Sequence, residues 1–208
     1  MKPMNDEFRS AAEQLVEVGR ALYARGMVPA TSGNFSCRLS DGAMAITVSG
    51  RHKGRLTPTD IMRASAAGES LDGNRPSAET LLHVQIYRRF PEVRCVLHPH
   101  SVNATLISKN RRGSLELQDY ELLKAFPGVD THEARVQVPI FANDQDIARL
   151  AAEVDAWMDA HDGPVHGYLI AGHGFYTWGA SVDDTMRHIE AFEFLFDCEL
   201  QQMRLGTV

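Results

Sequence analysis

A pair of histidines directly after an apolar segment constrains this chain more than any other feature. Residues 93–97 are mostly apolar and predict a short buried strand, and His98 and His100 follow at its end. Side chains two positions apart on a strand point to the same side, so both imidazoles can bind one metal ion. The alternative interpretation is two polar residues at a strand end. Alone the pair is weak evidence for a metal site, because the nine histidines of this chain can give such a spacing by chance.

A third histidine completes a ligand set. His173 lies between Gly172 and Gly174 in an otherwise apolar, β-rich segment, although a surface histidine in a β-turn would look similar. Burying a histidine is costly unless it is paired or ligating, and the glycines allow close approach. Three nitrogens with an open fourth position are the usual catalytic zinc site, although imidazoles also bind iron, cobalt or nickel. Given the pair at His98 and His100, we prefer His173 as the third ligand; the competitors for this position are His83, His166 and His188.

Composition narrows the class of protein. The chain has 208 residues, 44% hydrophobic and 23% charged, which suits one domain spanning residues 1–208. Its formal net charge of −6 argues against a nucleic-acid or anionic-membrane partner. No apolar run approaches the ~20 residues that span a bilayer, residues 1–7 are polar and acidic, and the three cysteines form no close pair. We expect a cytoplasmic protein.

Periodicity predicts strands and helices that interleave without a strict β-α-β repeat. Helical spacing covers residues 8–25, 79–89, 102–108, 119–126, 146–158 and a long segment from residue 181. Strand patterning covers residues 35–39, 44–48, 61–64, 93–97 and 136–141, and residues 167–178 are β-rich. Several strand pairs look like hairpins. These elements favour an α/β fold, with a central, mostly antiparallel sheet flanked by helices.

Three clusters of small polar residues fall at predicted strand or loop ends, over residues 31–34, 49–50 and 77–78, with Ser77 a predicted helix N-cap. Hydroxyls and backbone N–H groups at such positions bind phosphate without strong basic charge. Each cluster alone is better explained as a turn or a cap, but the combination favours a phosphate site. Its candidates are Ser32, Gly33, Asn34, Ser49, Gly50 and Ser77, with Lys53 and Arg55 as nearby cations.

Two glutamates are candidates for proton transfer. Glu79 follows Ser77 in the first turn of a predicted helix, and Glu121 lies in the helical stretch 117–126. Either can act as a general base beside a metal ion. Because an unselected glutamate is far more often a capping or solvent-facing residue, the residues alone leave this assignment open.

The ordered set of motifs resembles the class II aldolase/adducin family from about residue 8 to residue 200. The motifs are Ser32-Gly33-Asn34, Ser49-Gly50, Pro76-Ser77-Ala78-Glu79, His98-Pro99-His100 and Gly172-His173-Gly174. The connecting segments, among them Tyr120-Glu121-Leu122 and residues 139–146, resemble members that dehydrate a phosphorylated methylthio-ketopentose more than they resemble the aldolases. Ala78 stands where aldolases of the family often place a second serine, which puts one phosphate hydroxyl in doubt.

The resemblance implies a single-domain α/β/α fold, one zinc ion per subunit, and a homotetramer with active sites near subunit interfaces. It implies a lyase of methionine salvage that removes water from a small phosphorylated sugar through a metal-stabilised enediolate. Glu79 matches the base position of the aldolases, and Glu121 matches the acid/base position of the dehydratases. We expect Glu121 to transfer the proton, with Glu79 near the metal.

Two rival functions follow from the same residues. The first is an aldolase or epimerase that acts on another phosphorylated keto-sugar, because those enzymes share the enediolate chemistry. The second is a non-catalytic interaction module like the adducin head domains. Such a module would not need a complete metal site, so the presence of all three histidines disfavours it.

Overall fold

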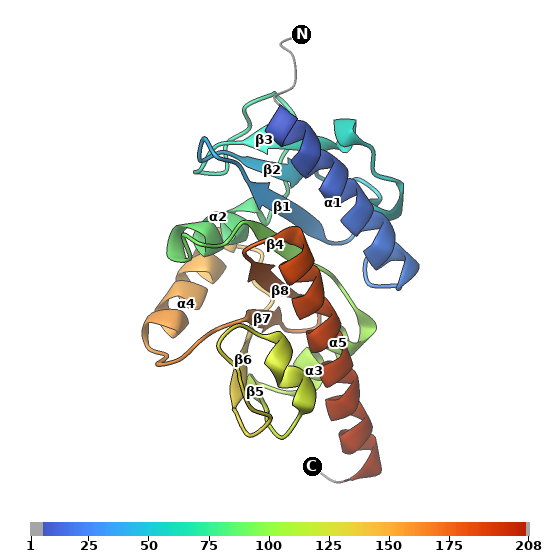
Figure 1. Cartoon of the computed structure of the whole chain (residues 1–208), viewed down its shortest axis with the longest axis vertical. Coiled ribbons are helices and arrows are strands. Elements are labelled where there is room, and N and C mark those ends of the chain that lie inside the picture. Colours follow the sequence, from blue (N-terminus) through green and yellow to red (C-terminus); the bar gives the residue numbers. More distant parts are fainter. Residues whose placement is uncertain (1–5, 207–208) are drawn as a thin grey trace.

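One eight-stranded sheet organises the chain in the computed structural model, which describes residues 6–206 (Figure 1). The strand order is β3-β2-β1-β4-β8-β7-β6-β5, and every neighbouring pair is antiparallel except β6 and β7. The expected central, mostly antiparallel sheet is confirmed. The strands are β1 (Asn34–Arg38), β2 (Met44–Thr47), β3 (Ile61–Ala64), β4 (Cys95–His98), β5 (Gly113–Leu117), β6 (Val136–Phe141), β7 (Gly167–Ile170) and β8 (Gly174–Gly179).

Helices cover both faces of the sheet, which gives the expected α/β/α layers (Figure 1). One core joins the sheet to α1, α3 and α5 through residues such as Leu15 and Phe192. The other core joins it to α2 and α4 through residues such as Leu82 and Val154. The helices are α1 (Asp6–Ala24), α2 (Thr80–Arg89), α3 (Val102–Asn110), α4 (Ile147–Asp159) and α5 (Val182–Leu205).

Alternation along the central strands explains the two cores. In β4, Leu97 packs in the core of α1 and α5, and Val96 packs in the core of α2 and α4. Successive strand side chains point to opposite faces, and a sheet buried on both faces needs apolar residues in both directions. Because His98 follows Leu97, its side chain lies on the α2 face, where its ring stacks on Tyr176 of β8.

Two local expectations differ from the structure. Residues 119–126 form only a short 3-10 helix, η3 (Glu121–Ala125), and strand β5 precedes it where no strand was predicted. Helix α2 begins at Thr80, so Glu79 rather than Ser77 occupies the N-cap position. The physical reason is that the Ser77 carbonyl and hydroxyl form a separate turn, accepting from the backbone N–H groups of Thr80 and Glu79 respectively.

Some expectations extend beyond the described residues. Residues 1–5, which carry most of the polar N-terminal segment, and residues 207–208 of the proposed domain lie outside them. Within residues 6–206, no helix combines the length and the apolar character that crossing a membrane requires. Cys37, Cys95 and Cys198 are all free thiols.

Candidate active site and metal centre

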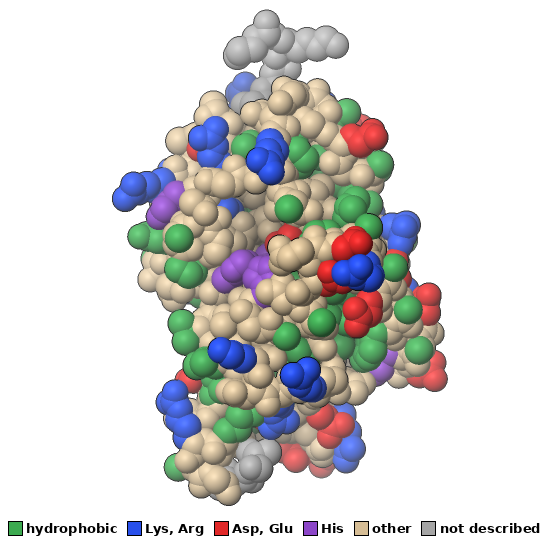
Figure 2. Space-filling view, turned by 180° about the vertical axis from the view of Figure 1, so that it is seen from behind, with side chains coloured by type: hydrophobic (Ala, Val, Ile, Leu, Met, Phe, Trp, Pro, Cys, Tyr) green, Lys and Arg blue, Asp and Glu red, His purple; other side chains and the backbone are tan. Residues whose placement is uncertain are grey.

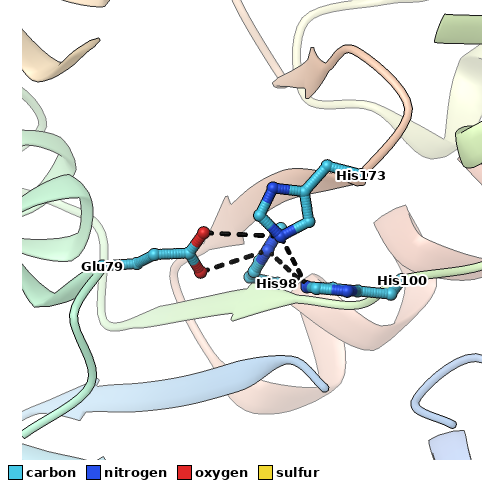
Figure 3. A group of neighbouring side chains, drawn as sticks. All are labelled: Glu79, His98, His100 and His173. Atoms are coloured by element: carbon cyan, nitrogen blue, oxygen red, sulfur yellow. Dashed lines mark hydrogen bonds and ion pairs between the residues drawn. The ribbon is translucent and has the colours of Figure 1, made fainter. Parts of the chain in front are cut away.

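Three histidines converge where strands β4 and β7 end and β8 begins (Figure 3). His98 is the last residue of β4, His100 follows two positions later, and His173 occupies the turn between β7 and β8. The Nε2 atom of His100 lies 2.9 Å from Nε2 of His98 and 3.0 Å from Nε2 of His173. Because β4 and β8 are neighbours in the sheet, the three predicted ligands meet despite their separation in sequence.

Hydrogen bonds and stacking orient the first two rings. His98 is fully buried, and its Nδ1–H donates to the backbone carbonyl of Phe175 at 2.8 Å. A carbonyl only accepts, so Nε2 is the unprotonated nitrogen of a neutral His98 ring. The same ring stacks on Tyr176 with centroids 4.0 Å apart. The backbone N–H of His100 donates to the carbonyl of Met27 at 2.8 Å. Contacts of this kind fix the direction of a metal ligand.

The turn that carries His173 depends on its two glycines. Gly172 has a φ of +65°, in the left-handed region that glycine adopts without a steric penalty. Gly174 lies so close to its neighbours that an added Cβ would be 2.3 Å from the carbonyl oxygen of Pro99. The same Cβ would be 3.1 Å from the rings of the other two histidines. Glycine therefore lets this turn close against the end of β4, as the flanking glycines predicted.

Glu79 brings a carboxylate to the histidines (Figure 3). Its Oε2 atom lies 3.3 Å from Nε2 of His98, and its Oε1 atom lies 3.4 Å from Nε2 of His173. Asn34 Nδ2 and the Tyr176 hydroxyl donate to Oε2 at 2.7 Å and 3.1 Å. Because Glu79 occupies the N-cap position of α2 without a side-chain cap bond, its carboxylate is free to reach the sheet.

The four side chains suit a metal ion. Their ligand atoms all lie within 4.8 Å of one another. Tetrahedral bonds from zinc to nitrogen of about 2.0–2.1 Å place the nitrogens about 3.3 Å apart, close to the separations found here. Unprotonated nitrogens and a carboxylate that face one another are stabilised by a shared cation. The arrangement can therefore hold a divalent metal ion.

Burial favours the form of these histidines that binds metal. Desolvation, with a smaller contribution from His173, lowers the pKa of His98 well below its usual value. Burial, with a contribution from His98, lowers the pKa of His100 to about 2. Metal binding requires a neutral imidazole. Protons therefore compete only weakly with a metal for these two ligands near neutral pH.

A cavity of about 280 Å³ opens beside the cluster, with Glu79, His100 and His173 in its wall. Of the predicted phosphate residues, those that also line it are Gly33, Asn34, Ser49, Gly50, Lys53 and Ser77. Ser32 does not line it, and its buried hydroxyl has no hydrogen-bond partner among the described residues. Figure 2 shows histidines near the middle of one face, with Lys and Arg side chains scattered over that face. An anion in the cavity would meet mainly hydroxyl and N–H groups.

Lys53 lies beneath the cavity and joins the loops that form its wall. Only 2% of the residue is exposed, and Nζ donates to the carbonyls of Thr31 and Arg51 at 2.9 Å and 2.7 Å. Burial lowers its pKa to about 8. The ammonium therefore ties the loop that precedes β1 to the segment that follows Gly50. Arg55, the other cationic candidate, is exposed.

The structure does not bring Glu121 to this cavity within one chain. Its side chain is 76% exposed, pairs with Lys124 at 2.7 Å and does not line the cavity. The preceding residue, Tyr120, donates its hydroxyl to Glu199 of α5 at 3.0 Å, which holds η3 in this orientation. Within one subunit, Glu121 therefore lies outside the cavity that Glu79 lines, and its expected role in proton transfer stays a prediction. Sequence spacing could not show this, because it does not indicate which way η3 faces.

Sequence patterns missed several residues of the site. Tyr176 carries a detectable signal, because alternation along β8 places it on the face of His98. The competing histidines, His83, His166 and His188, are buried but are not members of the described cluster. Thr31 also lines the cavity and belongs to the predicted polar cluster 31–34, and Gln145 lies in the connecting segment 139–146. The other cavity residues that were not predicted gave no distinctive pattern; they are Thr47, Val48 and Ile147.

Comparison with known proteins agrees with this geometry. The family model described as Class II Aldolase and Adducin N-terminal domain matches residues 13–200. A methylthioribulose-1-phosphate dehydratase from Methylococcus capsulatus is 63% identical over 193 residues, which are 93% of this chain and 94% of the relative. One from Pseudomonas paraeruginosa is 57% identical over 206 residues, which are 98% of this chain and 100% of the relative. The solved structure of L-fuculose-1-phosphate aldolase from Thermus thermophilus has a TM-score of 0.76 and 25% identity, and the match covers 95% of this chain and 96% of that one. The chain therefore belongs to the class II aldolase and adducin family.

Proposed function

We propose that this protein is a lyase that dehydrates 5-methylthioribulose 1-phosphate to 5-methylthio-2,3-diketopentyl 1-phosphate, a step of methionine salvage. The observation that carries the proposal is the identity of 57–63% to named methylthioribulose-1-phosphate dehydratases along more than nine-tenths of the chain. The site supports it, because the cluster of three histidines and Glu79 adjoins a cavity that the predicted phosphate residues other than Ser32 line.

The resident cofactor in this proposal is one zinc ion per subunit, held by His98, His100 and His173. The donor set supports zinc, because three imidazoles with an open position are its usual catalytic environment. When bound, the ion polarises the substrate carbonyl and makes the neighbouring C–H more acidic. The chain contributes His98 and His100, whose pKa values are lowered by burial, and a turn that places His173 beside them.

The phosphate binds in the same cavity, at the polar loops that line it. Backbone N–H groups of the glycine turns and hydroxyls such as that of Ser77 donate to its oxygens. Lys53 keeps two of the contributing loops together and adds positive charge from below. Anchoring the C1 phosphate places C2 and C3 toward Glu79, so binding energy is used to orient the reacting carbons. The remaining candidates are Ser32, Gly33, Asn34, Ser49 and Gly50.

Proton transfer in this proposal uses both glutamates. Glu79 removes the proton from C3, because its Oε1 atom faces the cluster and Asn34 and Tyr176 fix its other oxygen. The electron pair of that C–H bond forms an enediolate, the C4 hydroxyl leaves as water after receiving a proton, and the resulting enol becomes the 2,3-diketone. Glu121 supplies that proton from a neighbouring subunit, which its exposed position permits.

The same proposal includes the assembly. A cytoplasmic homotetramer of single domains spanning residues 1–208 would bring η3 of one subunit to the cavity of another. Leu122 beside Glu121 is exposed in one chain, so such a contact would also bury this leucine. Glu121→Gln should then lower turnover while the zinc content stays at the wild-type level. Wild-type turnover in that variant would remove Glu121 from the scheme.

A second candidate function is aldol cleavage of another phosphorylated keto-sugar. The fold shared with L-fuculose-1-phosphate aldolase favours it, but a fold does not decide between breaking C–C and C–O bonds. The test is to offer the zinc-loaded protein 5-methylthioribulose 1-phosphate and L-fuculose 1-phosphate in parallel. Loss of one water with the carbon chain intact supports the dehydratase. A two-fragment product from either substrate supports the aldolase.

A further inference from the structure

Five polar side chains form a buried row between strand β1 and helix α2. Asn34 and Ser36 are two apart in β1, so they point to the same face of the sheet. Glu79, His83 and Tyr87 follow one another at intervals of four along α2 and its N-cap, so they share one side of the helix. Polar groups in a core are costly unless each is hydrogen-bonded. Apolar packing alone therefore does not account for these five polar side chains in the core.

Hydrogen bonds join the row from end to end. The hydroxyls of Tyr87 and Ser36 are 2.8 Å apart, and the Ser36 oxygen is 2.7 Å from Nδ1 of His83. Nε2 of His83 bonds to Oδ1 of Asn34, whose Nδ2 donates to Glu79 Oε2 at 2.7 Å. Ser36 and His83 have no exposed surface, and Asn34 is 4% exposed. The protein alone therefore satisfies the middle of the row.

The direction of every bond follows from the carboxylate. An ionised Glu79 only accepts, so Asn34 must present its N–H group to it and its oxygen to His83. His83 therefore donates from Nε2. Burial lowers the pKa of His83 to about 4, so the ring is neutral near pH 7 and its Nδ1 accepts from Ser36. The Ser36 hydroxyl therefore donates its hydrogen to His83, and the Ser36 oxygen accepts a hydrogen bond from the Tyr87 hydroxyl.

We propose that His83 is a positioning residue for Glu79: its Nε2–H fixes the amide of Asn34, and that amide holds Glu79 Oε2 so that Oε1 remains turned toward the cavity. The inference rests on the proposed function, in which Glu79 takes the proton. The two oxygens of the carboxylate differ in their partners, since Oε2 accepts from Asn34 and Tyr176 and lies 3.3 Å from Nε2 of His98, while Oε1 lies 3.4 Å from Nε2 of His173. The inference also assigns the oxygen and one N–H of the Asn34 amide to the row.

The test compares substitutions along the row in the zinc-loaded, full-length protein. His83→Phe removes both ring nitrogens, whereas His83→Gln retains an N–H near the place of Nε2. Partners that orient a site residue typically contribute about 10–100-fold to activity, so kcat of His83→Phe should fall by about that factor. Its KM and zinc content should stay within about threefold of the wild type, because neither the phosphate donors nor the metal ligands have changed. His83→Gln should recover most of kcat.

Two further variants separate positioning from packing. Ser36→Ala removes the partner that fixes the tautomer of His83 and should lower kcat less than His83→Phe does. His188→Phe is the packing control, because His188 is another buried histidine, 1% exposed, that bonds to the carbonyl of Trp178 and does not line the cavity. Its kcat should stay at the wild-type level even if its unfolding temperature falls. A kcat loss in His188→Phe equal to that in His83→Phe would overturn the proposal.

A spectroscopic measurement tests the row without any substrate. In ¹⁵N-histidine spectra of the zinc-loaded wild type, with His83 assigned by its loss in His83→Phe, the signals should show a neutral ring with the proton on Nε2. A ring protonated on Nδ1 alone, or on both nitrogens at pH 7, would overturn the proposal. If the wild type does not convert 5-methylthioribulose 1-phosphate, the proposed function fails. The spectrum still tests which nitrogen of His83 is protonated, and so the direction of the hydrogen bonds in the row. Unchanged kcat in His83→Phe would refute positioning even with the expected tautomer.

Discussion

Substituting Gly174 by alanine should weaken metal binding although every ligand stays in place. The added Cβ would lie 2.3 Å from the carbonyl oxygen of Pro99, whereas ordinary contacts are about 3.5 Å, so the turn must move by roughly 1 Å. That movement displaces His173 relative to His98 and His100. Disturbing the support of a metal ligand lowers affinity by about 10–100-fold, which corresponds to about 1.4–2.7 kcal/mol. Overpacking adds about 1–3 kcal/mol of lost stability.

The matched control is Gly172→Ala, on the other side of His173. A Cβ there meets nothing within 4 Å, but the residue has a φ of +65°. This substitution therefore introduces backbone strain of about 1–2 kcal/mol without a steric clash at the site. It should lower the unfolding temperature while zinc affinity stays within about threefold of the wild type.

The assay is competition for zinc between metal-stripped protein and a chromophoric chelator. Thermal unfolding with and without saturating zinc provides a second reading, because ligand binding stabilises the folded state in proportion to affinity. Wild-type affinity in Gly174→Ala would refute the steric argument. An equal loss in both variants would show that strain in the turn, and not contact with Pro99, controls the position of His173.

Three further predictions address the phosphate site, the base and the buried histidines. Ser77→Ala should raise KM and the inhibition constant of inorganic phosphate together by roughly 10-fold, as expected for one hydrogen bond to a charged group worth about 1.5 kcal/mol; a change in kcat alone would contradict this role. Glu79→Gln should keep zinc and lose about 10²–10⁴-fold in kcat, and an active variant would remove Glu79 as the base. Burial lowers the pKa of His166 to about 4, so this ring is neutral when folded and takes up a proton on unfolding below pH 6.5. The free energy of unfolding should therefore fall as pH decreases from 6.5 to 4. Measured by urea unfolding, His166→Leu should reduce this pH dependence by about 1.4 kcal/mol per pH unit, and an unchanged pH dependence would be inconsistent with a neutral His166.

Features set by local spacing could be predicted from the sequence. The strand before His98, the turn of His173 and the polar loops that line the cavity each follow from periodicity, glycine or hydroxyl content over a few residues. Their meeting follows from the sheet order, in which β4 lies between β1 and β8. The sequence did not predict that order, because spacing alone cannot say which strands pair.

Features set by tertiary contacts were not accessible in the same way. Strand β5 was missed because only Leu115 and Leu117 carry its alternation, next to a stretch that looked helical. Glu121 was expected at the site, but the bond from Tyr120 to Glu199 holds η3 against α5 with the carboxylate outward. The role of His83 depends on facing residues of β1. The spacing of Glu79, His83 and Tyr87 predicts that they share one side of α2, but it does not predict which residues of β1 face that side.

The most direct measurement of the central claim is a zinc titration of metal-stripped protein in the presence of 5-methylthioribulose 1-phosphate, with product mass followed throughout. The account predicts that the diketone, one water lighter than the substrate, forms in proportion to zinc up to one equivalent per chain. His98→Ala should bind zinc weakly and form no product at any point of the titration. Full activity before zinc is added, or no diketone at full occupancy of the wild-type site, would contradict it.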